Sequence, residues 1–292
     1  MLERFIYADW EAPPEAMGFE MALGEVLERI RELLPGVLQG RDAALRDPAA
    51  MPAAFWDQCT ELYLVTPALV NVALNYKICV EQGLPLHPTH YFEVNDLNRF
   101  TETYHPAMAT EAHGLFLHAI RAARAVYALD PEAAELLALF RKEVPLILQG
   151  FIYASTKDKY TWRASDPRKI ASLADDVRKA MQPAVIVGAA HGSIISGLVF
   201  ANLMGAPLYF IRFSMFKRND QVPIVSPKDM AFLQAYREGP ALLFDEDVAK
   251  GTTLTKFSET LRPLFKLCNT ASVLRHTLSP CRPDFTGYAW ND

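Results

Sequence analysis

The stretch Ala241–Leu254, ALLFDEDVAKGTTL, decides the fold of the second half of the chain. Its first four residues are apolar and predict a short buried strand, and two acids, Asp245 and Glu246, come where that strand ends. A small loop over 249–253 then leads into apolar residues at helical spacing. Strand, loop and helix in this order are typical of one unit of a parallel sheet.

Strands and helices alternate on both sides of this stretch, from about residue 165 to the C-terminus. Strands are predicted at 184–188, 208–213, 241–244 and 271–274, and helices at 167–181, 194–204, 230–237 and 252–265. The alternation predicts an α/β domain with a parallel sheet flanked by helices. In such sheets ligands bind at the carboxyl ends of the strands.

Residues 1–160 have a different pattern and predict a mostly α-helical domain of unknown role. Apolar spacing predicts a helix over 18–34 that ends at Pro35-Gly36, a second helical region over 55–80 bent at Pro67, and helices over 111–129 and 131–142. Asp130 is expected to cap the last of these, with Pro131 in its first position. We place the boundary near residues 155–167, between domains over 1–160 and 165–292.

The composition excludes several classes of protein. Of the 292 residues 51% are apolar and 22% are charged, so the chain has enough apolar area to fold. The net charge of −5 argues against a general electrostatic grip on nucleic acid. The cysteines are far apart and predict neither a disulfide framework nor a Cys-rich zinc site; they are Cys59, Cys79, Cys268 and Cys281.

The most apolar stretch, 62–80, is interrupted by polar residues such as Asn71 and Lys77. We interpret it as a buried helix rather than a membrane span. The N-terminus lacks the long apolar region of a signal peptide, because charges come too early. We therefore expect a cytoplasmic protein without a membrane partner.

The loop after the acids has the chemistry of a sugar-phosphate site. Backbone N–H groups at a helix N-terminus attract a phosphate, and Thr252 and Thr253 add hydroxyl donors. Gly251 allows close approach of the backbone. The carboxylates of Asp245 and Glu246 can accept hydrogen bonds from a vicinal diol. The alternative is an ordinary strand, turn and capped helix with two solvated acids.

The same stretch resembles the phosphoribosyl-diphosphate (PRPP) motif of the type I phosphoribosyltransferases. The resemblance implies that Asp245 and Glu246 are the catalytic pair, which binds the ribose hydroxyls and, through water, Mg²⁺. It also implies a 5′-phosphate site made of Ala249, Lys250, Gly251, Thr252 and Thr253. Lys250 stands where the family usually has Thr, and Glu246 where it usually has Asp.

Two further segments are similar to parts of this family. Gly188–Ser193 is similar to the pyrophosphate loop, which implies pyrophosphate contacts from Ala190, His191 and Gly192. The family usually has Arg or Lys at the position of His191, and histidine is a weaker, pH-dependent cation. The polar stretch 214–229 resembles the loop that closes over PRPP, with Lys217 and Arg218 as candidate pyrophosphate contacts; a solvated charged loop is the alternative.

The C-terminus resembles the hypoxanthine-guanine phosphoribosyltransferases. Arg282–Tyr288 is similar to their hood segment, so that Phe285 would stack on the base and Thr286 would read its edge. Arg275 holds the position of a basic residue that contacts the exocyclic oxygen of the base. Asp292 falls near a family acid that approaches the base and a metal ion.

Ala249 departs from the pattern of the purine enzymes, which usually carry Asp there to handle the N7 proton of the base. Three alternatives follow: another group handles the proton, the base is already anionic, or the base is not a 6-oxopurine. The segment 157–163, KDKYTWR, is basic and aromatic. Three roles fit this segment: it lines a pocket entrance, it binds a nucleic acid strand, or it is a solvated linker.

The resemblance implies an enzyme that moves 5-phosphoribose from PRPP to a nitrogenous base, with a purine-like base favoured, and releases pyrophosphate. We expect Mg²⁺ as the cofactor, PRPP and the base as small-molecule partners, no nucleic acid partner, and a homo-oligomer. A different class fits the same residues: a catalytically weak or inactive protein that senses PRPP or a nucleotide. A third hypothesis gives the helical domain its own activity, regulated by the transferase-like part.

Overall fold

The computed structural model describes residues 1–215 and 218–291. The chain forms two compact units, and each is described by itself. The first unit consists of Met1–Asp9 and Pro13–Lys157, and the second of Trp10–Ala12 together with the chain from Asp158 onward. The second unit thus includes a three-residue segment from near the N-terminus, which the sequence analysis did not anticipate.

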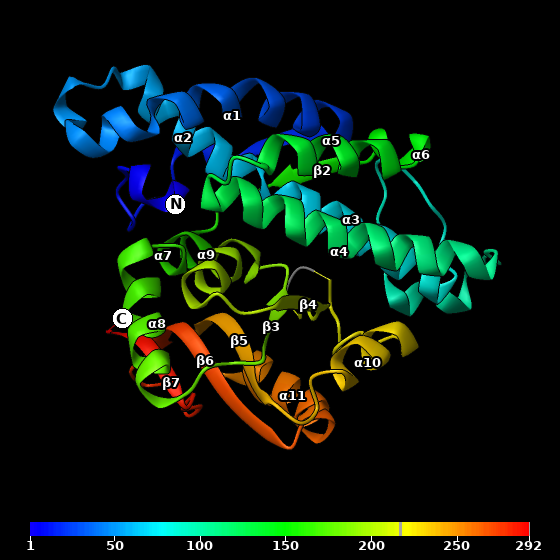
Figure 1. The fold of residues 1–292 in the computed structure, drawn as a ribbon. Coiled ribbons are helices and arrows are strands. Elements are labelled where there is room, and N and C mark those ends of the chain that lie inside the picture. Colours follow the sequence, from blue (N-terminus) through cyan, green and yellow to red (C-terminus); the bar gives the residue numbers. More distant parts are fainter. Residues whose placement is uncertain (216–217, 292) are drawn as a thin grey trace. The chain divides into compact units, whose positions relative to one another are not determined.

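The first unit is mostly helical, as predicted (Figure 1). Its helices are α1 (Leu23–Arg46), α2 (Ala53–Val65), α3 (Pro67–Gln82), α4 (Pro106–Ala128), α5 (Ala133–Glu143) and α6 (Leu146–Gln149), with 3-10 turns at Leu2–Phe5, Glu15–Met17, Pro48–Ala50 and Val94–Asn98. Two short strands, β1 (Phe19–Ala22) and β2 (Ile152–Ser155), pair antiparallel.

The helix expected over 18–34 has different ends in the structure. Residues 19–22 are the strand β1, and α1 continues past Pro35 to Arg46. A proline inside a helix removes one backbone hydrogen bond and costs about 3 kcal/mol. Here Ile30 and Leu34 before the proline and Val37 after it are all buried, so packing of one continuous apolar face outweighs that penalty.

The long apolar region is divided at Pro67, which is the first residue of α3. Within the described residues, one stretch, Ala53–Gln82, is long and apolar enough to cross a membrane, and 94% of its apolar window is buried. The expectation of a buried helix is confirmed. The predicted start of α5 is wrong by two residues: the Asp130 carboxylate accepts the Glu132 N–H, so Pro131 lies in the preceding turn.

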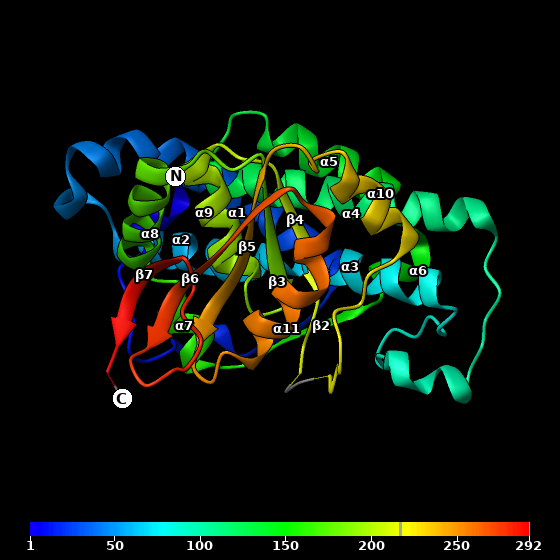
Figure 2. The ribbon, with the colours of Figure 1, turned by 90° about the horizontal axis from the view of Figure 1, so that it is seen from below.

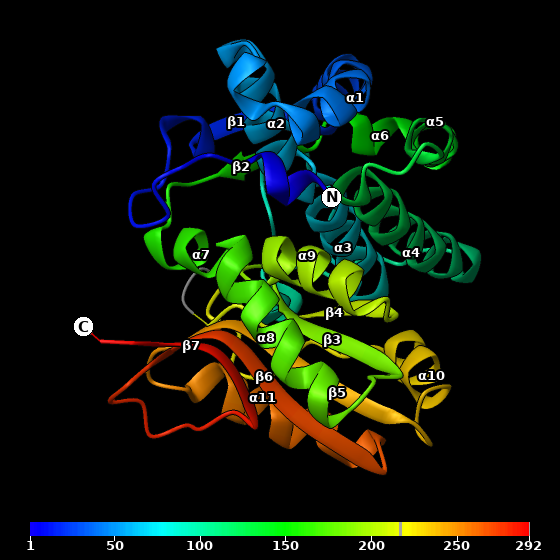
Figure 3. The same ribbon diagram turned by 60° about the vertical axis from the view of Figure 1, so that its left-hand side comes forward.

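The second unit contains the predicted parallel sheet. Its elements are α7 (Lys159–Ala164), α8 (Pro167–Ala180), β3 (Val185–Ala190), α9 (Ile194–Met204), β4 (Leu208–Arg212), α10 (Pro227–Gln234), β5 (Pro240–Val248), α11 (Thr252–Leu261), a 3-10 turn (Arg262–Leu264), β6 (Leu267–His276) and β7 (Phe285–Trp290). All five strands are parallel in the order β4-β3-β5-β6-β7 (Figure 2). Figure 3 shows α8 and α9 on one face and α11 on the other.

Two elements of this unit differ from the prediction. The predicted helix 230–237 begins earlier, because Ser226 and Asp229 cap the N-terminus of α10 reciprocally. Residues 285–288 of the expected hood segment, Arg282–Tyr288, belong to the edge strand β7, which is paired with β6 from Phe285 to Trp290. The structure therefore adds a fifth strand that sequence periodicity did not reveal.

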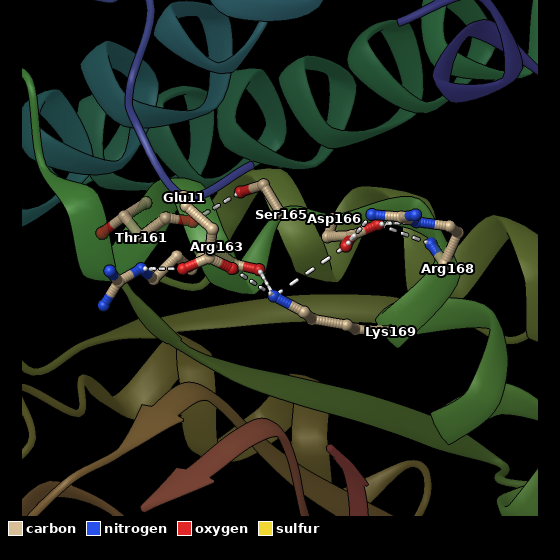
Figure 4. A network of polar contacts seen from close by, with 7 residues as sticks. All are labelled: Glu11, Thr161, Arg163, Ser165, Asp166, Arg168 and Lys169. Atoms are coloured by element: carbon tan, nitrogen blue, oxygen red, sulfur yellow. Dashed lines mark hydrogen bonds and ion pairs between the residues drawn. The ribbon is translucent and has the colours of Figure 1, made fainter. Parts of the chain in front are cut away.

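The segment Trp10–Ala12 is fixed to α7 and the start of α8. The Trp10 ring stacks on Trp162 with 4.4 Å between ring centroids. The Glu11 carboxylate lies 2.8 Å from Arg163 and 3.6 Å from Lys169 (Figure 4). These contacts join a remote part of the sequence to the helices beside β6 and β7.

Substitution Trp10→Ala is expected to lower the free energy of unfolding by about 3 kcal/mol, because it removes a large ring that is 7% exposed and stacked on Trp162. Urea unfolding followed by circular dichroism measures this. Leu278→Ala removes a side chain that is 89% exposed in the same unit and is the control, with little change expected. Equal effects of the two substitutions would show that the segment contributes no packing.

Candidate functional site

Two acids from β5 meet a glycine of the neighbouring strand's loop. Asp245 is 5% exposed, and its carboxylate accepts the backbone N–H of Glu246 at 3.1 Å. The Glu246 carboxylate lies directly against Gly192, where a Cβ atom would collide with it. Glu246 of the PRPP-like motif and Gly192 of the pyrophosphate-like loop are therefore in contact near the carboxyl ends of β5 and β3.

Burial dominates the electrostatics of this acid pair. It raises the pKa of Asp245 to about 6, with a further upward contribution from Asp247. Burial also raises the pKa of Glu246 well above its usual range, and the neighbouring Asp245 charge adds to that rise. Burial thus favours protonated carboxyls, whereas a bound cation or ribose hydroxyls would favour the charged form.

The loop after β5 has the geometry of a helix-start anion site. Gly251 has φ of +76° and immediately precedes α11, and Thr252 is the first helical residue. A Cβ atom on Gly251 would collide with the Cβ of Cys281, in the connection between β6 and β7. Only glycine fits both the backbone conformation and this contact. Ala249 and Lys250 are exposed beside it.

The segment 188–193 comprises the last three residues of β3 and the turn that leads into α9. Its Ala190–His191 peptide bond is cis, and the Ser193 hydroxyl donates to the Ala189 carbonyl at 2.6 Å. His191 is half-buried, and Gly192 faces Glu246. The residues predicted for pyrophosphate, Ala190, His191 and Gly192, are thus brought next to the acid pair.

The predicted closing loop 214–229 is tied to the sheet by a buried ion pair. The Arg212 guanidinium of β4 donates two hydrogen bonds to Asp220, at 2.8 and 3.1 Å, and the Ser214 N–H donates to the same carboxylate. Thr253 of α11 contacts the Met215 sulfur at 3.9 Å, which brings this loop to the phosphate-site loop. Arg218 is half-buried in the loop, and Lys217 lies outside the described residues.

Of the residues predicted to bind the base, Arg275 lies at the carboxyl end of β6, opposite Val248 of β5, but its guanidinium is engaged by nearby backbone. Arg275 donates to the carbonyls of Cys281 and Ser279, at 2.9 and 2.7 Å, so its guanidinium holds the connection between β6 and β7. Asp292 lies outside the described residues. These roles stay predictions.

Phe285 and Thr286 are the first two residues of β7. Phe285 pairs with Ala271 of β6, and the next residue of β6, Ser272, pairs with Asp245 of β5. Side chains alternate along a strand, so Phe285 and Gly287 share a face. A Cβ atom on Gly287 would lie 3.1 Å from the Leu173 Cβ of α8. Phe285 therefore faces the side covered by α8 rather than the carboxyl edge of the sheet.

A second polar group at the carboxyl edge was missed by sequence reasoning. The His276 Nε2 atom at the end of β6 lies 3.2 Å from the Asp247 carboxylate of β5. The Tyr160 ring of α7 lies 6.0 Å from the His276 ring. Asp247 could have been noticed as a third acid after the pair, and Tyr160 lies in the basic and aromatic segment 157–163. Their proximity to His276 follows only from the strand register.

The acid pair fits a magnesium ion only together with substrate oxygens. Among residues 1–215 and 218–291, no group of three or more His, Cys, Asp or Glu side chains could hold a metal ion. Mg²⁺ commonly takes one or two carboxylates plus phosphate oxygens and water. Asp245 and Glu246 supply the carboxylates of such a set.

Several solved structures are similar to part of this chain. The purine phosphoribosyltransferase from Pyrococcus horikoshii Ot3 is 22% identical over 43% of this chain and 83% of its own, with a TM-score of 0.35. The xanthine-guanine-hypoxanthine phosphoribosyltransferase of Helicobacter pylori is 18% identical over 40% of this chain and 77% of its own, with a TM-score of 0.31. A hypothetical protein from Neisseria gonorrhoeae with bound ppGpp is 17% identical over 44% of this chain and 80% of its own, with a TM-score of 0.38. No protein-family model matches the sequence, and no curated protein matches it.

Gly251→Ala is expected to destabilise the protein by about 3 kcal/mol, since the new Cβ combines a positive φ with a collision against Cys281. Gly205→Ala is the matched control: Gly205 has φ of +62° but nothing within 4 Å, so a loss of about 1 kcal/mol is expected. Urea unfolding of both variants measures the difference. Equal losses would show that Cys281 does not constrain the loop.

The raised pKa values of the acid pair predict a pH dependence of stability. From about pH 4 to above pH 6 the folded protein retains protons that the unfolded chain has lost, so the free energy of unfolding falls as the pH rises. The double variant Asp245→Asn with Glu246→Gln removes this effect. We expect it to be more stable than the parent protein at pH 8 by about 1–3 kcal/mol and to differ little at pH 4.

Chemical unfolding at several pH values tests this difference. Glu238→Gln, which changes an exposed acid at a surface ion pair, is the control and should leave the pH profile unchanged. A double variant that is less stable than the parent protein at pH 8 would contradict the assigned cause, burial of the charged carboxylates.

Proposed function

We propose that the second unit transfers 5-phosphoribose from PRPP to a nitrogenous base, releasing pyrophosphate. The observation that carries the proposal is the contact between the Glu246 carboxylate and Gly192, with Asp245 buried beside it. It joins a sugar-binding acid pair to a loop suited to the leaving group, at the sheet edge where parallel α/β sheets bind ligands.

Each part of the substrate has a chemically matched partner at this edge. The carboxylates of Asp245 and Glu246 accept hydrogen bonds from the two ribose hydroxyls. The N-terminus of α11, with Thr252 and Thr253, takes the 5′-phosphate, and Lys250 adds a positive charge. The backbone around His191 takes the pyrophosphate.

In the reaction, the bond from C1 of ribose to the pyrophosphate oxygen breaks, and its electron pair leaves with the oxygen. A ring nitrogen of the base forms the new bond to C1 with its lone pair, and the proton of that N–H group passes to the departing pyrophosphate. Positive charge develops on the ribose ring as the first bond breaks. The acid pair stabilises this charge, and loop 214–229 excludes water from the site.

Magnesium would supply charge neutralisation for the pyrophosphate. Asp245 and Glu246 are the residues that would hold it, through water, together with phosphate oxygens of the substrate. Burial raises the pKa of both carboxyl groups, and a cation bound beside them would lower it again, because a nearby positive charge stabilises the ionised form.

The direct test is pyrophosphate release by the whole protein with PRPP, Mg²⁺ and a panel of purine and pyrimidine bases. We expect turnover with at least one base, and a loss of at least about 100-fold in kcat/KM for the variant Asp245→Asn with Glu246→Gln. Glu238→Gln should keep full activity. Turnover that the double variant retains in full would remove the acid pair from the reaction.

The alternative function is ligand sensing without catalysis. The observation that favours it is the engagement of Arg275 with the carbonyls of its own loop, combined with Ala249 where a purine enzyme has Asp. Saturable binding of PRPP or a nucleotide in calorimetry, with no pyrophosphate released for any base, would establish this alternative. Binding of neither ligand would exclude both functions.

A further inference from the structure

The carboxyl edge of the sheet holds an aromatic group that neither the acid pair nor the phosphate-site loop explains. Tyr160 is 43% exposed, and its ring lies 6.0 Å from the ring of His276. His276 is 7% exposed and paired with Asp247 at 3.2 Å. Asp247 lies two residues after Asp245 on the same face of β5, so this aromatic group adjoins the proposed ribose site.

We propose, resting on the function proposed above, that Tyr160 is the surface on which the acceptor base stacks and that His276, oriented by Asp247, supports it. The chemistry that Tyr160 offers is a partly exposed π face, which suits a flat heteroaromatic ring. The Lys159 Nζ atom lies 5.1 Å from the centre of the same ring and adds positive charge for an electron-rich or anionic base. This role replaces the one that the sequence assigned to Phe285.

The helix that carries Tyr160 is held firmly on both sides of that residue. Trp162 stacks on Trp10, and Arg163 pairs with Glu11 (Figure 4). The Asp158 carboxylate caps the helix start by accepting the N–H groups of Tyr160 and Thr161. A rigid support of this kind lowers the entropy cost of ordering a ring for stacking.

The position of His276 follows from the register of three strands. Asp247 pairs with Leu274 two residues before His276, and His276 pairs with Trp290 at the end of β7. The Arg163 Cζ atom lies 4.4 Å from the centre of the Trp290 ring, so the guanidinium covers one face of that ring. The ends of β6 and β7 thus place His276 beside Trp290, and α7 brings the Tyr160 ring to His276.

Binding calorimetry on the whole protein tests the stacking role without requiring turnover. Ribose 5-phosphate and the monophosphates of guanosine, inosine, adenosine and uridine are titrated in Mg²⁺ buffer, so that the gain of nucleotide over sugar phosphate reports the base alone. We expect the best nucleotide to bind at least tenfold more tightly than ribose 5-phosphate. Tyr160→Ala should remove about tenfold of that gain and leave ribose 5-phosphate affinity unchanged.

Four further variants test the role of the ring. Tyr160→Phe should restore nucleotide affinity, Tyr160→Leu should not, and Phe285→Ala should leave it unchanged. Asp247→Asn should weaken nucleotide binding by a larger factor than ribose 5-phosphate binding, because it releases the support of the stacking ring in addition to removing a charge beside the acid pair. Unaltered nucleotide affinity in Tyr160→Ala, or a loss in Phe285→Ala alone, would overturn the stacking role while leaving the transferase proposal intact.

The remaining outcomes are also decisive. If the parent protein binds ribose 5-phosphate but no nucleotide more tightly, the edge holds no base subsite and the inference is wrong. If the parent protein binds neither ribose 5-phosphate nor PRPP, the proposed function itself fails. The affinity for ribose 5-phosphate in each variant reports whether the fold of the site is preserved.

Discussion

The contact between the Glu246 carboxylate and Gly192 is the constraint on which the site depends. It exists because β3 and β5 are neighbours in the sheet and end at the same edge. A side chain at position 192 would push the acid away, and a shorter strand β5 would leave it in solvent. The geometry concentrates two carboxyl groups where burial raises their pKa.

A second constraint fixes the loops around that edge. The buried Arg212–Asp220 pair ties the start of loop 214–229 to β4, and Gly251 packs against Cys281 of the β6–β7 connection. Removing one partner of a buried ion pair is strongly destabilising, so the Arg212–Asp220 pair holds the start of loop 214–229 in place. The site is therefore built by connections that follow four different strands.

The helical unit and the sheet differ in how their packing relates to sequence. In α1, an apolar face that continues past Pro35 decides the helix length against the local preference of proline. In the sheet, fully buried strands such as β3 follow their apolar runs closely. Local rules therefore failed where a long-range packing surface competed with them.

Much of the site was accessible from sequence because it is local. Asp245, Glu246 and Gly251 lie within one strand, loop and helix, and their residue types suit a sugar phosphate, with an ordinary strand, turn and capped helix as the alternative. The segment after Gly188 has the same local character. In both segments the residues lie within fewer than fifteen positions of one another, so local backbone structure determines how far apart they are in space.

Other features were decided only by tertiary structure. Phe285 and Arg275 have the residue types of a base site, but pairing of β7 with β6 turns Phe285 toward α8, and the loop carbonyls take the Arg275 guanidinium. Tyr160, Asp247 and His276 are separated by up to 116 positions and meet only because α7 packs against the ends of β5 and β6. Residue chemistry is written in the sequence, whereas strand register, which depends on the whole sheet, determines which side chains share an edge.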